Sequence, residues 1–342
     1  MSIWRVNAAL HTIVSIVILW FGIAITYAQP SDSLIMTGLS WNPDGSQIAL
    51  GMIGRIDILD VPTLSIIGSL SSGYSDQILS IKWSPNGQYI AATSTNYPEV
   101  FIWNLSSERY SNQVPSITLL GDNRSSLYHL TWSPDSQRIG GISFDDALLQ
   151  IWNLDSKTVT LALRGIQNGL DWYENYLTIG VGEGASLYNV DTGQFIRTIA
   201  YHPAQLSVIR WSPDGSKIAT TGTDGFVRVW SADPIIADDI HRLMRIHISQ
   251  SMVASVSWSP DSSMIAASGF SGEIVIWNIS EDRLVSATNA GVPVRTIEWS
   301  PTGLSVAYTK DSLPYFDIIH IEPSAVTNSG STPTPSPAAP SP

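Results

Sequence analysis

The densest group of polar side chains that could hold a metal ion lies late in the sequence. Asp238, Asp239, His241 and His247 combine carboxylate and imidazole groups, which are ligands for zinc and related ions. A metal site would need these groups to converge on one ion, whereas carboxylates adjacent in sequence diverge on an extended chain. The group is therefore interpreted as a loop followed by a strand surface, and no metal or other cofactor is expected.

Two further motifs resemble parts of enzyme sites. Asp145 and Asp146 form an acidic pair that could bind calcium or share a proton, but such a pair is more typical of a turn. Gly180–Gly184 approaches a dinucleotide fingerprint, which needs a following helix so that backbone amides face the pyrophosphate. A strand-like run follows instead, which predicts a tight turn. No HExxH motif, nucleophile elbow or phosphate loop is present, and the chain is predicted not to be an enzyme.

The composition excludes several classes of protein. The 342 residues carry a formal charge of -12, from 17 basic and 29 acidic side chains, which argues against nucleic acid as a partner. Cysteine is absent, so disulfides and thiolate zinc sites are excluded. Hydrophobic residues make up 44% of the chain, enough for a large core, and 13 residues are tryptophan.

A motif of tryptophan followed by a turn repeats through the chain. Successive tryptophans of the motif are 39 to 49 residues apart. Six copies read Trp-Ser-Pro-Asp-Gly or a close variant: Trp41–Gly45, Trp83–Gly87, Trp132–Ser136, Trp211–Gly215, Trp258–Ser262 and Trp299–Gly303. A seventh copy, at Trp172, is degenerate. Proline and aspartate or glycine at these positions predict a tight turn between two strands.

Each repeat contains enough apolar runs for four short strands. A third run commonly ends in Ile-Trp-Asn, as in Leu149–Leu154 and Ile274–Ile279, and a shorter fourth run follows. Four antiparallel strands per period of about 43 residues form a propeller blade, and seven such blades close into a ring. The sequence predicts an all-β, seven-bladed β-propeller in which the periodic tryptophans pack within and between blades.

The repeated motif resembles the WD-repeat β-propellers over roughly residues 34–322. It departs from that family because the Gly-His dipeptide before the first strand is missing almost everywhere and few strands end in Trp-Asp. TolB-like propellers, which also use Ser-Pro-Asp-Gly turns, are the alternative, and the Ile-Trp-Asn strand ends argue against them.

The resemblance implies a hydrogen-bonded tetrad in the fifth blade that stiffens it, rather than a catalytic His-Asp dyad. The matching residues are His202, Thr221 or Thr223, Asp224 and Trp230. In the third blade, Asp146 matches the tetrad aspartate, since it lies six residues before Trp152.

The ends of the chain differ from its repeated middle. Residues 1–28 are predicted to be a signal peptide cleaved before Gln29; the alternative is an uncleaved anchor that crosses a membrane with residues 10–28. The propeller is assigned to residues 30–328, and residues 329–342 form a disordered Ser/Thr/Pro-rich tail. Because few residues precede the first blade, blade seven is expected to be closed weakly by Ser324–Asn328 or to lack its fourth strand.

Loops at one face of the predicted ring carry aromatic and charged residues of the types enriched in binding sites. The candidates are Arg55, Tyr74, Tyr97, Glu99, Asn123, Arg124, Phe144, Asp145, Glu183, Phe270, Glu273 and Tyr315. The expected function is a monomeric, extracytoplasmic platform, secreted or on the cell surface, for a protein or peptide partner. The alternative is an exported enzyme or small-ligand binder that uses the central channel.

Overall fold

Strands dominate the part of the chain that the structure describes. The computed structural model describes residues 38–105, 110–122, 125–143, 145–166, 168–232, 242–312 and 315–321, all of which belong to one unit of the chain, Ile35–Pro342. Within these residues no helix has the length and hydropathy to span a bilayer. The predicted leader and the predicted tail lie outside the described residues.

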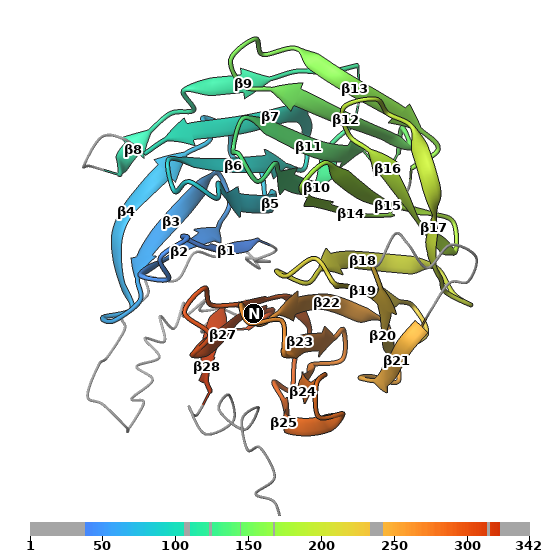
Figure 1. The fold of residues 1–342 in the computed structure, drawn as a ribbon. Coiled ribbons are helices and arrows are strands. Elements are labelled where there is room, and N and C mark those ends of the chain that lie inside the picture. Colours follow the sequence, from blue (N-terminus) through green and yellow to red (C-terminus); the bar gives the residue numbers. More distant parts are fainter. Residues whose placement is uncertain are drawn as a thin grey trace, which may run out of the picture. The chain divides into compact units, whose positions relative to one another are not determined.

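The strands form seven sheets that follow one another along the chain, and each sheet is one blade (Figure 1). Blade one contains β1 (Leu39–Trp41), β2 (Gln47–Gly51), β3 (Arg55–Asp60) and β4 (Ser65–Ser71). Blade two contains β5 (Ile78–Trp83), β6 (Tyr89–Ser94), β7 (Tyr97–Asn104) and β9 (Ile117–Leu119). Blade three contains β10 (Leu127–Trp132), β11 (Arg138–Ser143), β12 (Leu148–Asn153) and β13 (Val159–Arg164).

The remaining blades repeat the same antiparallel order. Blade four contains β14 (Asn168–Tyr173), β15 (Tyr176–Val181), β16 (Gly184–Asn189) and β17 (Phe195–Tyr201). Blade five contains β18 (Leu206–Trp211), β19 (Lys217–Gly222), β20 (Phe226–Ser231) and β21 (Arg242–His247). Blade six contains β22 (Val253–Trp258), β23 (Met264–Gly269), β24 (Glu273–Asn278) and β25 (Arg283–Asn289); blade seven contains β26 (Val294–Trp299), β27 (Ser305–Lys310) and β28 (Phe316–His320). The predicted all-β, seven-bladed propeller is confirmed.

Blade one carries a fifth strand that the sequence did not predict. The long connection between β7 and β9 places β8 (Ser111–Gln113) against the outer edge of β4, in parallel. Gly68 allows this approach, because a Cβ at that position would lie 2.2 Å from the Cβ of Tyr110. The connection therefore covers the edge of the preceding blade, which would otherwise expose unpaired backbone groups.

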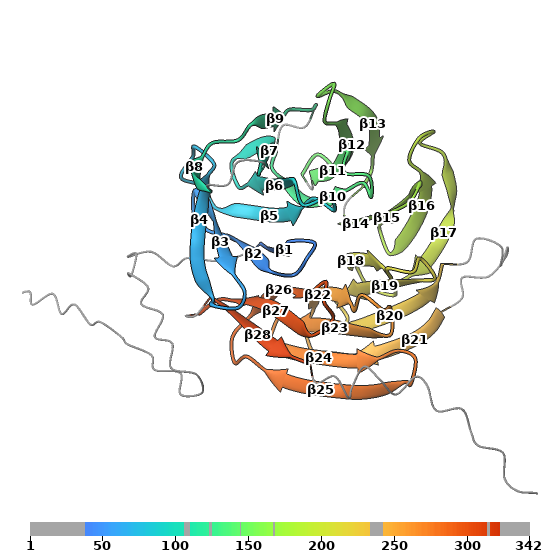
Figure 2. The ribbon, with the colours of Figure 1, turned by 60° about the vertical axis from the view of Figure 1, so that its left-hand side comes forward.

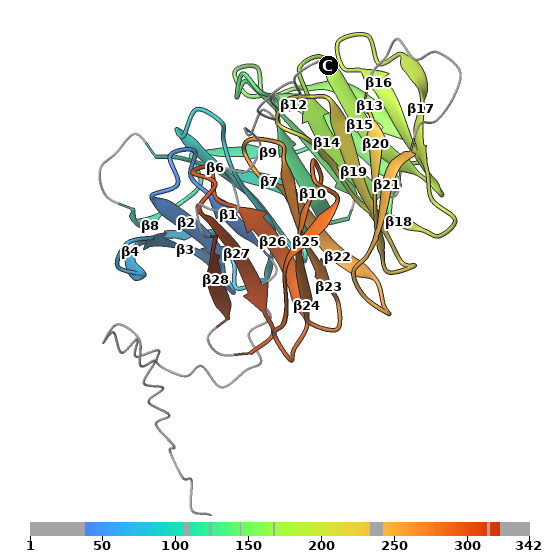
Figure 3. The same cartoon turned by 60° about the horizontal axis from the view of Figure 1, so that its bottom comes forward.

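Blade seven has three strands among the described residues. The residues expected to complete it, Ser324–Asn328, lie outside the described ranges, so that expectation stays a prediction. The ring nevertheless closes through packing, since Ala307 and Phe316 of blade seven share a buried cluster with Leu39 and Trp41 of blade one (Figures 2 and 3).

The predicted turn forms between the first and second strands of each blade. In blade five, the Gly215 N–H donates to the Ser212 carbonyl at 2.9 Å, and Gly215 has φ +69°. Asp214 accepts the Ser212 hydroxyl at 2.6 Å and the Ser216 N–H at 3.0 Å. The Ser-Pro-Asp-Gly sequence therefore satisfies its own polar groups, as expected of such a turn.

Blades three and six have serine where the turn normally has glycine. Ser136 and Ser262 both adopt φ +60°, a conformation that costs a side-chain-bearing residue energy. Their hydroxyls accept backbone N–H groups from the turns of the preceding blades, from Asn86 and from Asp214, each at 3.1 Å. These serines therefore bind neighbouring blades together.

Apolar side chains of neighbouring blades pack together at every blade interface. Each of seven buried clusters combines residues of two adjacent blades. All seven turn tryptophans are buried, with 6–8% of their surface exposed. The interpretation of these tryptophans as packing residues is confirmed.

Candidate functional site

One face of the ring carries the turns between second and third strands and the connections that lead into each next blade. We call it the connecting-loop face. Most of the candidate binding residues lie there, but Asn123, Arg124 and Phe144 lie outside the described residues. The described candidates divide into a small aromatic cluster, an aromatic residue with an ion pair, and residues with structural partners.

The aromatic cluster lies over blades one and two. The rings of Tyr74 and Tyr97 stack with centroids 3.8 Å apart, and Tyr74 also contacts Phe101 at 5.5 Å. Tyr74 and the neighbouring Ile53 each expose 40% of their surface. Burial and the nearby Asp76 raise the pKa of Tyr97, so its hydroxyl stays protonated and able to donate at neutral pH. The cluster offers a partly exposed aromatic surface with Tyr74 outermost.

A second aromatic group lies over blades six and seven. Phe270 is 38% exposed and lies under the guanidinium of Arg295, 5.4 Å from its ring centroid. Arg295 is held by a two-pronged ion pair with Asp311, with both N–O distances 2.9 Å. Sequence reasoning missed Arg295 and Asp311, which are distant in sequence from Phe270.

Three other candidates have local structural contacts, and a fourth is exposed. Arg55 is paired with Asp57, at 2.9 Å from Nε to Oδ1. Glu183 accepts the Tyr201 hydroxyl at 2.6 Å. Tyr315 packs against the core between blades seven and one, and Asp145 is exposed.

Two candidate carboxylates are partly withdrawn from solvent. Glu99 and Glu273 each have one buried oxygen, Oε2, that makes no hydrogen bond in the described structure. A Cβ at Gly269 would lie 2.3 Å from the Glu273 oxygen, which shows how closely the carboxylate is packed. Neither has the geometry of an exposed contact residue on the connecting-loop face.

In blade five, an arginine occupies the centre of the predicted tetrad. Arg228 Nη1 donates to His202 Nδ1 at 2.8 Å, and its Nη2 donates to Asp224 at 2.6 Å. His202 and Asp224 are 3.7 Å apart, so Arg228 joins them. The choice of Thr221 was wrong: the Trp230 indole donates to Thr220 Oγ1 at 2.7 Å, while Thr221 accepts the Val208 N–H.

Burial and the charge of Arg228 keep the histidine of this blade neutral. Burial and the adjacent Arg228 lower the pKa of His202 to about 4, although Asp224 acts in the opposite direction. Burial alone would raise the pKa of Asp224, but Arg228 lowers it. A neutral histidine that accepts a hydrogen bond and an ionised aspartate form a stiffening group rather than a catalytic pair. In blade three, Asp146 likewise accepts hydroxyls from Ser125 and Ser143, at 2.8 and 3.0 Å.

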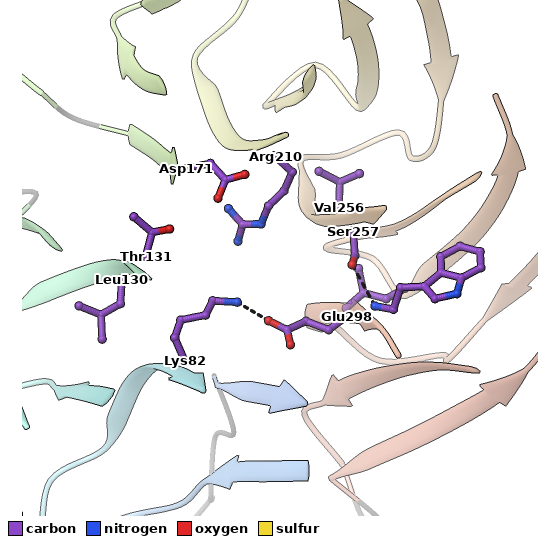
Figure 4. Close-up of a pocket in the computed structure, with 10 residues that line it drawn as sticks. Lys82, Leu130, Thr131, Asp171, Arg210, Val256, Ser257 and Glu298 are labelled. Atoms are coloured by element: carbon purple, nitrogen blue, oxygen red, sulfur yellow. Dashed lines mark hydrogen bonds and ion pairs between the residues drawn. The ribbon is translucent and has the colours of Figure 1, made fainter. Parts of the chain in front are cut away.

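A ring of polar side chains around the central channel was missed by the sequence analysis. Each belongs to the residue directly before a turn tryptophan: Ser40, Lys82, Thr131, Asp171, Arg210, Ser257 and Glu298. Six of them line a cavity of about 230 Å³ (Figure 4). Four of the seven are charged, and this periodic signal was already available in the sequence.

The same ring joins neighbouring blades in two ways. Where the ring residue has a short side chain, that side chain accepts a hydrogen bond from the backbone N–H of the turn tryptophan in the next blade. The three bonds are Trp83 to Ser40 at 3.1 Å, Trp211 to Asp171 at 2.7 Å, and Trp299 to Ser257 at 2.9 Å. Where the ring residue has a long, charged side chain, the indole N–H of the turn tryptophan in the next blade donates to its backbone carbonyl. The three bonds are Trp132 to Lys82 at 3.0 Å, Trp258 to Arg210 at 3.1 Å, and Trp41 to Glu298 at 3.2 Å. Six of the seven blade interfaces are tied at the channel wall.

The described residues contain no group of three or more side chains placed to hold a metal ion. Of the four polar residues considered first in the sequence, only His247 is described; its ring lies edge-on to Phe226 at 5.0 Å. The glycine-rich segment forms the expected turn between β15 and β16, with Gly182 at φ +59°.

Comparisons with known proteins agree with this architecture. Residues 65–104, 193–231 and 240–278 match the family model for the WD domain, G-beta repeat, and each match ends with the third strand of a blade. The β-propeller domain of Cps50 (Swd1) from Myceliophteria thermophila is similar in fold, with a TM-score of 0.71, 17% identity, and coverage of 84% of this chain and 99% of that domain. No curated protein matches the chain. The three repeat matches and the seven blades support a WD-repeat β-propeller.

Proposed function

We propose that the chain is a non-enzymatic WD-repeat propeller that presents a rigid platform to a protein or peptide partner outside the cytoplasm. The observation that carries the proposal is the Tyr74–Tyr97 stack, in which Tyr74 is 40% exposed and rests on the partly buried Tyr97. Tyrosine provides large contact area at a low entropy cost, and it is enriched where binding energy concentrates. Buried clusters at all seven blade interfaces favour a surface that is formed before the partner binds.

The two channel carboxylates favour a structural role over an acid-base pair. Asp171 accepts the N–H of Trp211, and Glu298 is paired with Lys82. Both carboxylates already have partners in the wall of the ring.

Site-specific photo-cross-linking tests the platform. A photoreactive phenylalanine at Tyr74 should capture one defined partner in extracts of the native host. The matched control carries the same residue at Asp155, which is exposed in the turn between β12 and β13 at the opposite end of the blade. Equal capture at both positions, or no defined partner at Tyr74, would contradict the proposal.

The location outside the cytoplasm has its own test. N-terminal sequencing of the chain recovered from fractionated cells should find Gln29 as the first residue in the extracytoplasmic fraction. A chain that begins at Met1 or Ser2 and remains in the cytoplasmic fraction would overturn export without affecting the platform.

A further inference from the structure

The cavity in the channel combines positive and negative side chains from different blades. Its lining includes Lys82, Thr131, Asp171, Arg210, Ser257 and Glu298, which come from six of the seven inner strands. The volume of about 230 Å³ is enough for several water molecules or one small organic molecule. It is below the usual range for larger ligands, so a bulky molecule would not fit.

One of the two cations in this cavity is already neutralised. Lys82 of blade two and Glu298 of blade seven form an ion pair (Figure 4). Blade one, between these two blades, has the short Ser40 at the equivalent position. Arg210 differs, because no carboxylate of the described chain lies within ion-pairing distance of it. Its Nη1 donates to the Ile209 carbonyl at 2.7 Å, and the guanidinium points into the cavity toward Asp171 (Figure 4).

The groups near Arg210 leave acceptors and donors available to a ligand. Asp171 uses Oδ2 to accept the Trp211 N–H. Ser257 accepts the Trp299 N–H, so its own hydroxyl hydrogen remains free to donate. His129 lies nearby, and burial together with the charges of Arg210 and Lys82 lowers its pKa to about 4, so it adds no charge at neutral pH.

Charge balance decides which ligand the cavity would accept. With His129 neutral and Asp171 ionised, Lys82 and Arg210 balance Asp171 and Glu298. Burial raises the pKa of Asp171, while Arg210 and the N–H groups of Trp211 and Trp172 favour its ionised form. A ligand with a net charge would bring an uncompensated charge into a partly buried site, which is costly. A ligand with one positive and one negative group keeps the balance and can pair each group with its opposite.

We propose that the channel binds one small zwitterion of the amino-acid type. Its carboxylate pairs with Arg210 through two N–H groups and accepts the Ser257 hydroxyl, while its ammonium group donates to Asp171 and Glu298. The ring residues directly precede the turn tryptophans, at the ends of the inner strands that lead into the Ser-Pro-Asp-Gly turns. The ligand therefore enters from the end of the channel opposite the connecting-loop face, and its binding does not depend on the partner proposed above.

Calorimetric titration of the full chain with glycine, L-alanine and L-serine tests this site. At least one should bind with a Kd below roughly 10 mM, and N-acetyl-L-alanine and L-alanine methyl ester should each bind at least about tenfold more weakly than the parent amino acid. No binding by any of the three amino acids would overturn the proposal. So would equal binding of either analogue, which would indicate a site for a single charge.

Substitution of Arg210 identifies the site on the chain. Arg210→Gln should weaken binding at least about tenfold, whereas Arg283→Gln, which changes an exposed arginine on β25, should leave it unchanged. Arg210→Lys, which keeps the charge, should bind with intermediate affinity. Thermal unfolding without ligand checks that each variant folds, and unchanged binding by a folded Arg210→Gln chain would overturn the proposal. The analogue titrations test the wild-type chain even if that variant does not fold.

Discussion

The carboxylate of Asp171 in blade four accepts the backbone N–H of Trp211 in blade five at 2.7 Å. The bond lies at the channel wall, where burial raises the pKa of Asp171 although Arg210 and the Trp211 N–H act in the opposite direction. Burial thus opposes ionisation of this side chain, whereas the neighbouring cation and the hydrogen bond favour it. In blades one and six, Ser40 and Ser257 make the equivalent contact without charge.

Replacing Asp171 should show what this contact contributes. Asp171→Ala leaves the Trp211 N–H without its acceptor, and should lower the free energy of unfolding by about 1–3 kcal/mol. Asp171→Asn keeps an acceptor oxygen and should be closer to the wild type. Urea unfolding measures both, with the exposed Asp155→Ala as control; equal stability of the Ala and Asn variants would show that the hydrogen bond contributes nothing.

The turn aspartates should make the ring sensitive to acid. For Asp214 and Asp261, burial alone would raise the pKa, but serine hydroxyls and backbone N–H groups hold the pKa below its usual value. A lowered folded pKa adds stability that is present above the unfolded pKa and is lost as the pH falls through the folded pKa. The double variant Asp214→Asn/Asp261→Asn should therefore lose less stability between about pH 5 and pH 2 than the wild type. Denaturant unfolding across that range checks this, and parallel pH profiles would refute it.

Substitutions of Ser262 should distinguish the energy cost of its strained backbone from the stability that its hydrogen bond to the neighbouring blade contributes. Ser262→Ala keeps the positive φ and removes the acceptor of the Asp214 N–H, so it should destabilise by about 1–3 kcal/mol. Ser262→Gly loses the same bond but relieves roughly 1 kcal/mol of strain, and should unfold at a higher denaturant concentration than Ser262→Ala. The reverse order of the two midpoints would contradict this account of the turn.

The pKa of His202 should depend on the positive charge of the neighbouring Arg228. Arg228→Met removes the cation that contributes to the lowered pKa and leaves Asp224, which acts to raise it. The pKa should therefore rise above its present value of about 4. An NMR titration of the His202 ring measures it, with Arg283→Met as a remote control. An unchanged pKa would mean that burial alone keeps the ring neutral.

The periodic features of the fold were predictable from the sequence because they depend on local chemistry. Trp211 and the Ser-Pro-Asp-Gly turn after it occur at fixed spacing, and each residue type has a local reason for its position. The third-strand tryptophans Trp103 and Trp152 are likewise fully or almost fully buried, as periodicity predicted.

The remaining features depend on register and on contacts between distant segments. Trp230 pairs with Ile218 across the sheet, so Thr220 shares its face and Thr221 does not; this register could not be read from the sequence. Six of the seven inner strands have a register shift against the second strand of their blade, which no residue pattern revealed: β5, β10, β14, β18, β22 and β26. The stacking of Tyr74 on Tyr97 joins the connection between blades one and two to the start of β7, and the sequence predicted only that both tyrosines share a face.

The most direct test of the platform is the affinity of the cross-linked partner for variants of the Tyr74–Tyr97 stack. Tyr74→Ala/Tyr97→Ala should weaken binding at least about tenfold, or about 1.4 kcal/mol, while Asp155→Ala should bind as the wild type does. Tyr74 is exposed, but Tyr97 packs against the buried cluster between blades one and two, so thermal unfolding is used to select conditions in which the double variant is folded. Unchanged affinity of the double variant, measured by calorimetry on folded protein, would contradict the assignment of the connecting-loop face as the binding surface.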